Sequence, residues 1–144
     1  MAEYKTTDVS APFSGNYGNR VVYAGVASVS AALAIADTVK PVKIPGGTRV
    51  DRVVIVNGDL DSGATLTDKI GFLPIDGSAG DDDAFCASGA TTRRAAATTT
   101  YEIFPPVVVP KDSWLVLTCV AAATGLAATV DVSAKVEGEI LGKK

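Results

Sequence analysis

The chain has 144 residues, of which 47% are apolar and 20% are charged, and its net charge is −3 at pH 7. This composition excludes a chain that is disordered throughout, and the length fits one domain with a real core. The acidic balance argues against direct binding to nucleic acid, and no apolar run approaches the roughly 20 residues that a membrane-spanning helix needs.

The first 19 residues are polar, with many glycine, serine, asparagine and threonine residues and no clear period. We therefore expect an extended arm over residues 1–19, followed by one domain over residues 20–144. Phe13 and Tyr17 are the side chains that would anchor this arm on its own domain or on a neighbour. The arm contains no apolar segment of the kind found in secretory signals, so we expect synthesis in a cytoplasm.

The first half of the domain predicts strands over 20–30, 38–44 and 48–57, because valine is abundant there and favours extended backbone. Gly25 indicates a bulge or a close backbone approach in the first of these strands. Residues 31–37 are compatible with a helical turn or a loop. The segment 48–57 ends in consecutive apolar residues, which predicts burial on both faces at that end.

The segment 38–44 is expected to lie at a sheet edge or to be bulged, because Pro41 has no N–H to donate to a neighbouring strand. An edge strand can extend a sheet into a neighbouring subunit. We therefore predict Val39, Pro41 and Val42 as interaction residues. A turn follows this segment at residues 45–47.

The second half predicts a strand over 68–75, a polar turn region over 75–83 and a long surface excursion over 84–100 that ends in a short strand. Residues 100–110 begin extended, and Pro105 and Pro106 are expected to stop regular pairing. Residues 113–121 form a buried strand. Residues 128–140 alternate strictly between apolar and polar side chains, which is typical of a strand with one wet face.

Short strands separated by glycine, proline and aspartate turns, with no long amphipathic helix, predict an all-β protein. The fold that we expect is an antiparallel β-sandwich, jelly-roll-like, with the extended N-terminal arm attached.

Catalytic groups are scarce in this sequence. The chain has no histidine, which removes the usual general base and the commonest transition-metal ligand, so we expect no enzyme activity and no cofactor. Asp59 and Asp61 resemble part of a calcium loop, but Gly63 comes one residue too early and the closing glutamate is missing. Aspartate in such a loop more often stabilises turns.

The two cysteines are expected to differ in their surroundings. Cys119 lies in an apolar run, which predicts a small core residue, whereas Cys86 follows an acidic segment, which indicates partial exposure. The sequence leaves open whether the two are joined by a disulfide.

The segment 42–78 carries a proline–glycine turn into a valine-rich strand, an aspartate–glycine loop and a strand with a Gly-Phe pair. In this order of features the sequence resembles the small decoration or cement proteins of tailed-bacteriophage heads. The resemblance rests on Pro45, Gly47, Val50, Asp59, Asp61, Gly63 and Gly71-Phe72. The resemblance in the general pattern of turns and strands extends over roughly residues 38–140.

The resemblance implies a β-sandwich that binds the outside of the assembled capsid and cements neighbouring capsomers. It implies the phage major capsid protein as one partner and the chain itself, as a homodimer or homotrimer, as the other. The location would be the capsid surface of the virion, after synthesis in the host bacterial cytoplasm.

Two alternatives stay open. One is a different virion component, such as a neck, tail or head-fibre subunit, and the other is a carbohydrate-binding β-sandwich or small glycosidase that uses the aspartate-rich loops.

Overall fold

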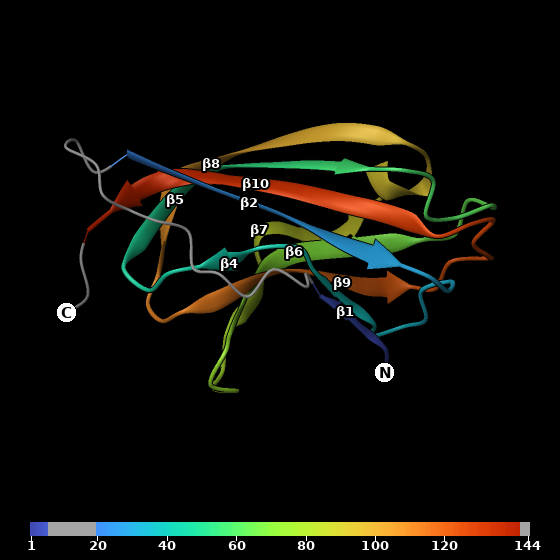
Figure 1. Ribbon diagram of the computed structural model, residues 1–144, viewed down its shortest axis with the longest axis horizontal. Coiled ribbons are helices and arrows are strands. Elements are labelled where there is room, and N and C mark those ends of the chain that lie inside the picture. Colours follow the sequence, from blue (N-terminus) through green and yellow to red (C-terminus); the bar gives the residue numbers. More distant parts are fainter. Residues whose placement is uncertain (6–19, 142–144) are drawn as a thin grey trace.

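The computed structural model describes residues 1–5 and 20–141, and these residues form two β-sheets that pack face to face around one core (Figure 1). The six-stranded sheet contains β1 (Glu3–Lys5), β3 (Thr38–Lys40), β4 (Lys43–Ile44), β6 (Thr67–Pro74), β7 (Asp81–Ala90) and β9 (Ser113–Ala121). The four-stranded sheet contains β2 (Arg20–Val29), β5 (Thr48–Asn57), β8 (Ala97–Val109) and β10 (Val130–Ile140). The helical part of the described chain is a 3₁₀ turn at Thr92–Arg94.

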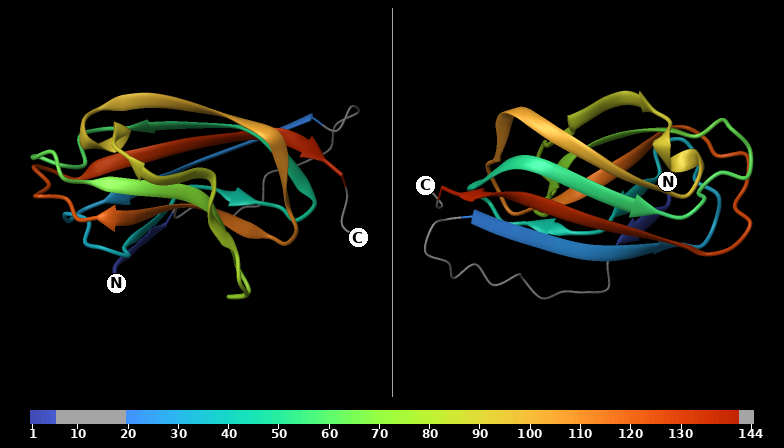
Figure 2. Two further views of the ribbon diagram at one scale, coloured as in Figure 1. Left: turned by 180° about the vertical axis from the view of Figure 1, so that it is seen from behind. Right: turned by 90° about the horizontal axis from the view of Figure 1, so that it is seen from above.

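The strand pairings are nested, as in one long hairpin that has been folded over. β2 pairs with β10, β3 and β4 pair with β9, β5 pairs with β8, and β6 pairs with β7, all antiparallel. Folding this ribbon brings β10 beside β5 and β9 beside β6, which gives the order β2-β10-β5-β8 in one sheet and β3-β9-β6-β7 in the other. This is the arrangement of a jelly roll, so the expected fold class is confirmed (Figure 2).

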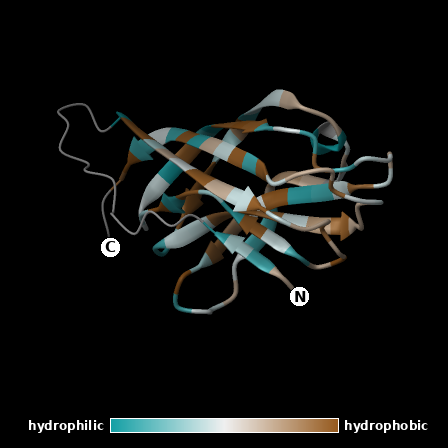
Figure 3. Cartoon of the chain, turned by 45° about the vertical axis from the view of Figure 1, so that its right-hand side comes forward, coloured by the Kyte–Doolittle hydropathy of each residue, from teal (hydrophilic) through white to brown (hydrophobic). Residues whose placement is uncertain are grey.

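The core lies between the two sheets and follows the alternation of the strands (Figure 3). In β10, Val132, Ala134 and Val136 are buried, while the polar residues between them face outward, as the period of two predicts. In β9, Leu115 and Leu117 face them from the opposite sheet. Each fully buried aliphatic side chain of this kind contributes about 1.5–3 kcal/mol to folding.

Residues 38–44 form two short strands, and Pro41 and Val42 separate β3 from β4. The edge position that the sequence predicts here is occupied, because β1 pairs in parallel with β3 and places Glu3 opposite Thr38. Residues 3–5 therefore form an edge strand of the six-stranded sheet.

Gly25 lies where the two sheets meet, at the edge next to Pro41. A Cβ atom on Gly25 would lie 2.2 Å from the Pro41 carbonyl oxygen, so only glycine fits without a backbone shift. The predicted close backbone approach is confirmed. It joins the edge of the four-stranded sheet to the loop between β3 and β4.

Two segments differ from the sequence-based expectation. Residues 81–90 form the edge strand β7, which was expected to be turn and surface excursion, and its irregular pairing with β6 explains why no clean alternation marks it. The far end of β5 was expected to be covered on both faces, but Val56 is 46% exposed on the outer face of the four-stranded sheet. No helix in residues 1–5 and 20–141 is long and apolar enough to cross a membrane.

Candidate interaction surface

The three predicted interaction residues that the structure describes are buried. Val39 and Val42 are 1% and 3% exposed, and Pro41 between them is also buried, because β3 and β4 are covered by β2 and β9 in the interior of the sandwich. Their role is to pack the core, which corrects the prediction. Phe13 and Tyr17 lie outside the described residues.

The Asp59–Asp61 loop uses its carboxylates to hold its own backbone. Asp61 is 1% exposed, and its two carboxylate oxygens accept hydrogen bonds at 2.7–3.1 Å from the backbone N–H groups of Gly63, Thr65, Leu66 and Thr124. Asp59 accepts the N–H of Asp61 at 3.0 Å. Burial alone would raise the pKa of Asp61, but the four N–H donors outweigh it and hold this pKa below its usual value. The loop therefore has the geometry of a turn.

No cluster of three or more histidine, cysteine, aspartate or glutamate side chains is arranged to hold a metal ion within the part of the chain that the structure describes. The two cysteines are both free, with Cys119 buried and Cys86 partly exposed, as the sequence predicts. Burial raises the pKa of the Cys119 thiol to about 11 and also raises that of Cys86, so neither is a thiolate at neutral pH.

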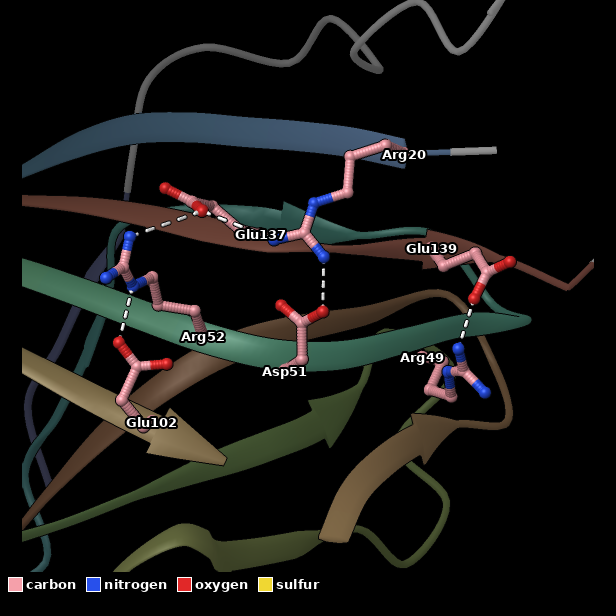
Figure 4. A network of polar contacts seen from close by, with 7 residues as sticks. All are labelled: Arg20, Arg49, Asp51, Arg52, Glu102, Glu137 and Glu139. Carbon is pink, nitrogen blue, oxygen red and sulfur yellow. Dashed lines mark hydrogen bonds and ion pairs between the residues drawn. The ribbon is translucent and has the colours of Figure 1, made fainter. Parts of the chain in front are cut away.

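A network of ion pairs covers one end of the outer face of the four-stranded sheet (Figure 4). Arg52 lies 2.7 Å from Glu102 and 3.8 Å from Glu137, and Arg20 lies 3.4 Å from Glu137 and also contacts Asp51. We call this set, together with the Arg49–Glu139 and Lys135–Glu137 pairs, the charged network. Its members come from β2, β5, β8 and β10, whose register places them in adjacent rows.

Glu137 is the centre of the charged network. Lys135, at 2.5 Å, lowers the pKa of Glu137, and the guanidinium groups of Arg52 and Arg20 lower it further. The carboxylate is therefore ionised at neutral pH. The alternation of residues 135–139 predicts that their polar side chains face water. Which residues of β2 and β5 lie beside them cannot be read from that alternation, because it depends on the strand order.

Beside the charged network, the pairing of β8 with β5 is interrupted. Val107 pairs with Val50 and Glu102 pairs with Arg52, so residues 103–106 stand opposite Asp51 alone. The predicted break in pairing is confirmed: Pro105 and Pro106 have no N–H to donate, and the pairing of β8 with β5 resumes at Val107.

This bulge presents Phe104 to solvent at 93% exposure. Next to it lies a groove of about 320 Å³, lined by Arg20, Asp51, Arg52, Glu102, Ile103, Phe104 and Pro106. We call it the β8 groove. An aromatic ring and a groove on one face are the features of a protein contact surface, and sequence reasoning missed them because Phe104 alone does not reveal its exposure.

A buried ion pair lies under the 3₁₀ turn. Arg93 Nε is 2.6 Å from Asp68 Oδ2, and both side chains are at most 5% exposed. The Arg93 guanidinium also donates to the Tyr101 hydroxyl and lies 5.6 Å from the centre of its ring. This cluster ties β6, β8 and the turn together in the interior, so its position indicates a structural role.

No family model matches the sequence, and no curated protein is significantly similar to it. Two solved structures match the fold along almost the whole chain. A chain of the capsid asymmetric unit of cyanophage Pam1 matches with a TM-score of 0.67 and 19% identity, over 93% of this chain and 94% of that one. A chain of the capsid of Ralstonia phage GP4 matches with a TM-score of 0.75 and 16% identity, over 98% of this chain and all of the other. The protein thus shares its complete jelly-roll fold with a chain from each of these two phage capsids.

Proposed function

We propose that the protein is a structural component of a bacteriophage virion that binds the outside of the assembled capsid and cements neighbouring capsomers. The observation that carries this proposal is the full-length match, in both directions, to chains of two phage capsids. Because the matched chains are no longer than this fold, a jelly roll of this size can be a capsid subunit in its own right.

The chemistry of the described residues is compatible with a structural role. The aspartate loop, which was the candidate for catalysis or glycan binding, uses Asp61 to hold four backbone N–H groups. On the outer face of the four-stranded sheet, exposed arginine and glutamate side chains are paired in the charged network. Such a face suits contact with another protein.

Cementing follows from mass action. A subunit that binds the assembled shell and not its separated parts stabilises the shell by the free energy of that binding. Many copies placed across the seams between capsomers would add their effects. The partners in this proposal are the phage major capsid protein and further copies of the chain, as a dimer or trimer.

The proposal is tested by adding purified protein to expanded capsids that lack it and sedimenting the particles. We expect saturable binding, a stoichiometry of hundreds of copies per particle and a higher temperature of capsid disruption. Absence of the protein from intact virions would refute the virion role. A stoichiometry of a few copies would instead favour the neck, tail or head-fibre alternative.

A further inference from the structure

Phe104 is an apolar ring that the fold holds in water. Its side chain is 93% exposed, and on the same strand Val108 is 47% exposed. The two prolines that follow Phe104 have fixed φ angles, so the backbone that carries the ring has little freedom to lose on binding. Burying a phenylalanine from this position would remove a large apolar surface from water, which favours association.

The β8 groove next to Phe104 is suited to an aromatic ring. Its volume of about 320 Å³ is ample for a phenyl group, and Ile103 and Pro106 provide apolar walls. The guanidinium groups of Arg20 and Arg52 line the same groove. A guanidinium group packs favourably against the face of an aromatic ring.

The ring and the groove lie side by side on one surface, so a second copy can offer its own ring to this groove and its own groove to this ring. A two-fold rotation about an axis between them would place the Phe104 ring of each copy in the groove of the other. Such an isologous contact closes on itself and gives a dimer without further growth.

The charges around the groove favour the same partner. Four cations and four carboxylates alternate in the charged network: Arg20, Arg49, Arg52 and Lys135 with Asp51, Glu102, Glu137 and Glu139. A partner of one predominant charge would place like charges against half of these groups, whereas a second copy brings the same mixed pattern.

We infer that two copies of the chain associate through the outer face of the four-stranded sheet, with the Phe104 ring of each copy seated in the β8 groove of the other. The dimer deepens the proposed function by assigning a surface to self-association, and it rests on that function only for its role in the virion.

The test is sedimentation equilibrium of the full-length protein and of three variants. We expect a dimer for the wild type, and a dissociation constant that is at least about 30-fold larger for Phe104→Ser. Phe104→Tyr keeps the ring and should stay dimeric. Ile35→Ser, at a 68% exposed residue of the β2–β3 loop, is the matched control and should also stay dimeric.

A monomeric wild type at about 100 μM would overturn the inference. So would a dimer that is unchanged by Phe104→Ser, or an oligomer other than a dimer. Circular dichroism establishes that each variant is folded. Arg52→Ala alters the groove and leaves Phe104 in place, and it should also weaken the dimer. Capsid binding is measured separately, so a protein that dimerises but does not sediment with capsids would count against the proposed function alone.

Discussion

Arg93 and Asp68 form an ion pair in the interior of the sandwich, with 2.6 Å between Arg93 Nε and Asp68 Oδ2. The pair joins the 3₁₀ turn to β6, which lies inside the six-stranded sheet. Two charges removed from water are costly unless each satisfies the other, so the stability of this region depends on both residues.

The first prediction concerns pH. Burial raises the pKa of Asp68 from 3.8 to about 6, although Arg93 opposes the shift. A carboxyl group with a raised pKa binds its proton more tightly in the folded state, so its contribution to stability is present below about pH 4 and is lost as the pH rises through 6. Between pH 4 and 7 the free energy of unfolding of the wild type should therefore fall relative to that of Asp68→Asn. Urea titrations of both proteins across this pH range measure the difference in free energy of unfolding. If the two pH profiles run parallel, the prediction is wrong.

The second prediction concerns Arg93, the cation of this ion pair. Arg93→Met leaves the Asp68 carboxylate buried without its counter-charge, which should cost about 3–5 kcal/mol at pH 7. The loss should be smaller at pH 5, where Asp68 can take up a proton. Arg94→Met is the matched control, since Arg94 Nε donates to the neutral carbonyl of Leu66, at 2.7 Å, and its loss should cost about 1 kcal/mol. Equal losses for the two variants in chemical unfolding would refute this account.

The third prediction concerns the Asp61 loop. Asp61→Ala removes the acceptor of four backbone N–H groups and should destabilise the protein by about 2–4 kcal/mol. Asp59→Ala, at an exposed residue that accepts one N–H, should cost about 1 kcal/mol or less.

Thermal unfolding measures both variants. Because the Asp61 oxygens are already engaged with N–H donors, added calcium should leave the melting temperature of the wild type unchanged. A rise in melting temperature that Asp61→Asn abolishes would identify an ion site instead.

The fourth prediction concerns the contact between the sheet edges. Gly25→Ala places a methyl group 2.2 Å from the Pro41 carbonyl oxygen, which is backbone and cannot rotate away. We expect a loss of about 2–3 kcal/mol or more. Ala24→Val, at the exposed neighbouring residue of the same strand, should change stability by less than about 0.5 kcal/mol. The comparison fails if both substitutions have the same effect in chemical unfolding.

Much of the fold is predictable because its central strands alternate clearly. Residues 128–140 and 113–121 fix which side chains face the core, and the turn at residues 45–47 separates two strands as expected. β7 was missed because an edge strand with one neighbour needs few apolar residues, and Phe85 is its one fully buried large side chain among the described residues.

The candidate surface was less predictable than the fold. Val39 and Val42 fit an exposed edge by their proximity to Pro41, but β1 and the opposite sheet cover that edge. The exposure of Phe104 depends on a register shift between β5 and β8 that no local pattern reveals. Contacts between distant strands decide which apolar side chains remain outside.

The nested strand pairing also has a consequence for synthesis of the protein. Arg20, at the start of β2, pairs with Glu139, near the end of β10, and β10 is the strand that connects β2 to β5. Until β10 has been made, β2 lacks the strand with which it pairs in the four-stranded sheet. The four-stranded sheet can therefore be completed only after β10 has been made, and such pairing between strands far apart in the sequence slows folding and prolongs the exposure of apolar strands to aggregation.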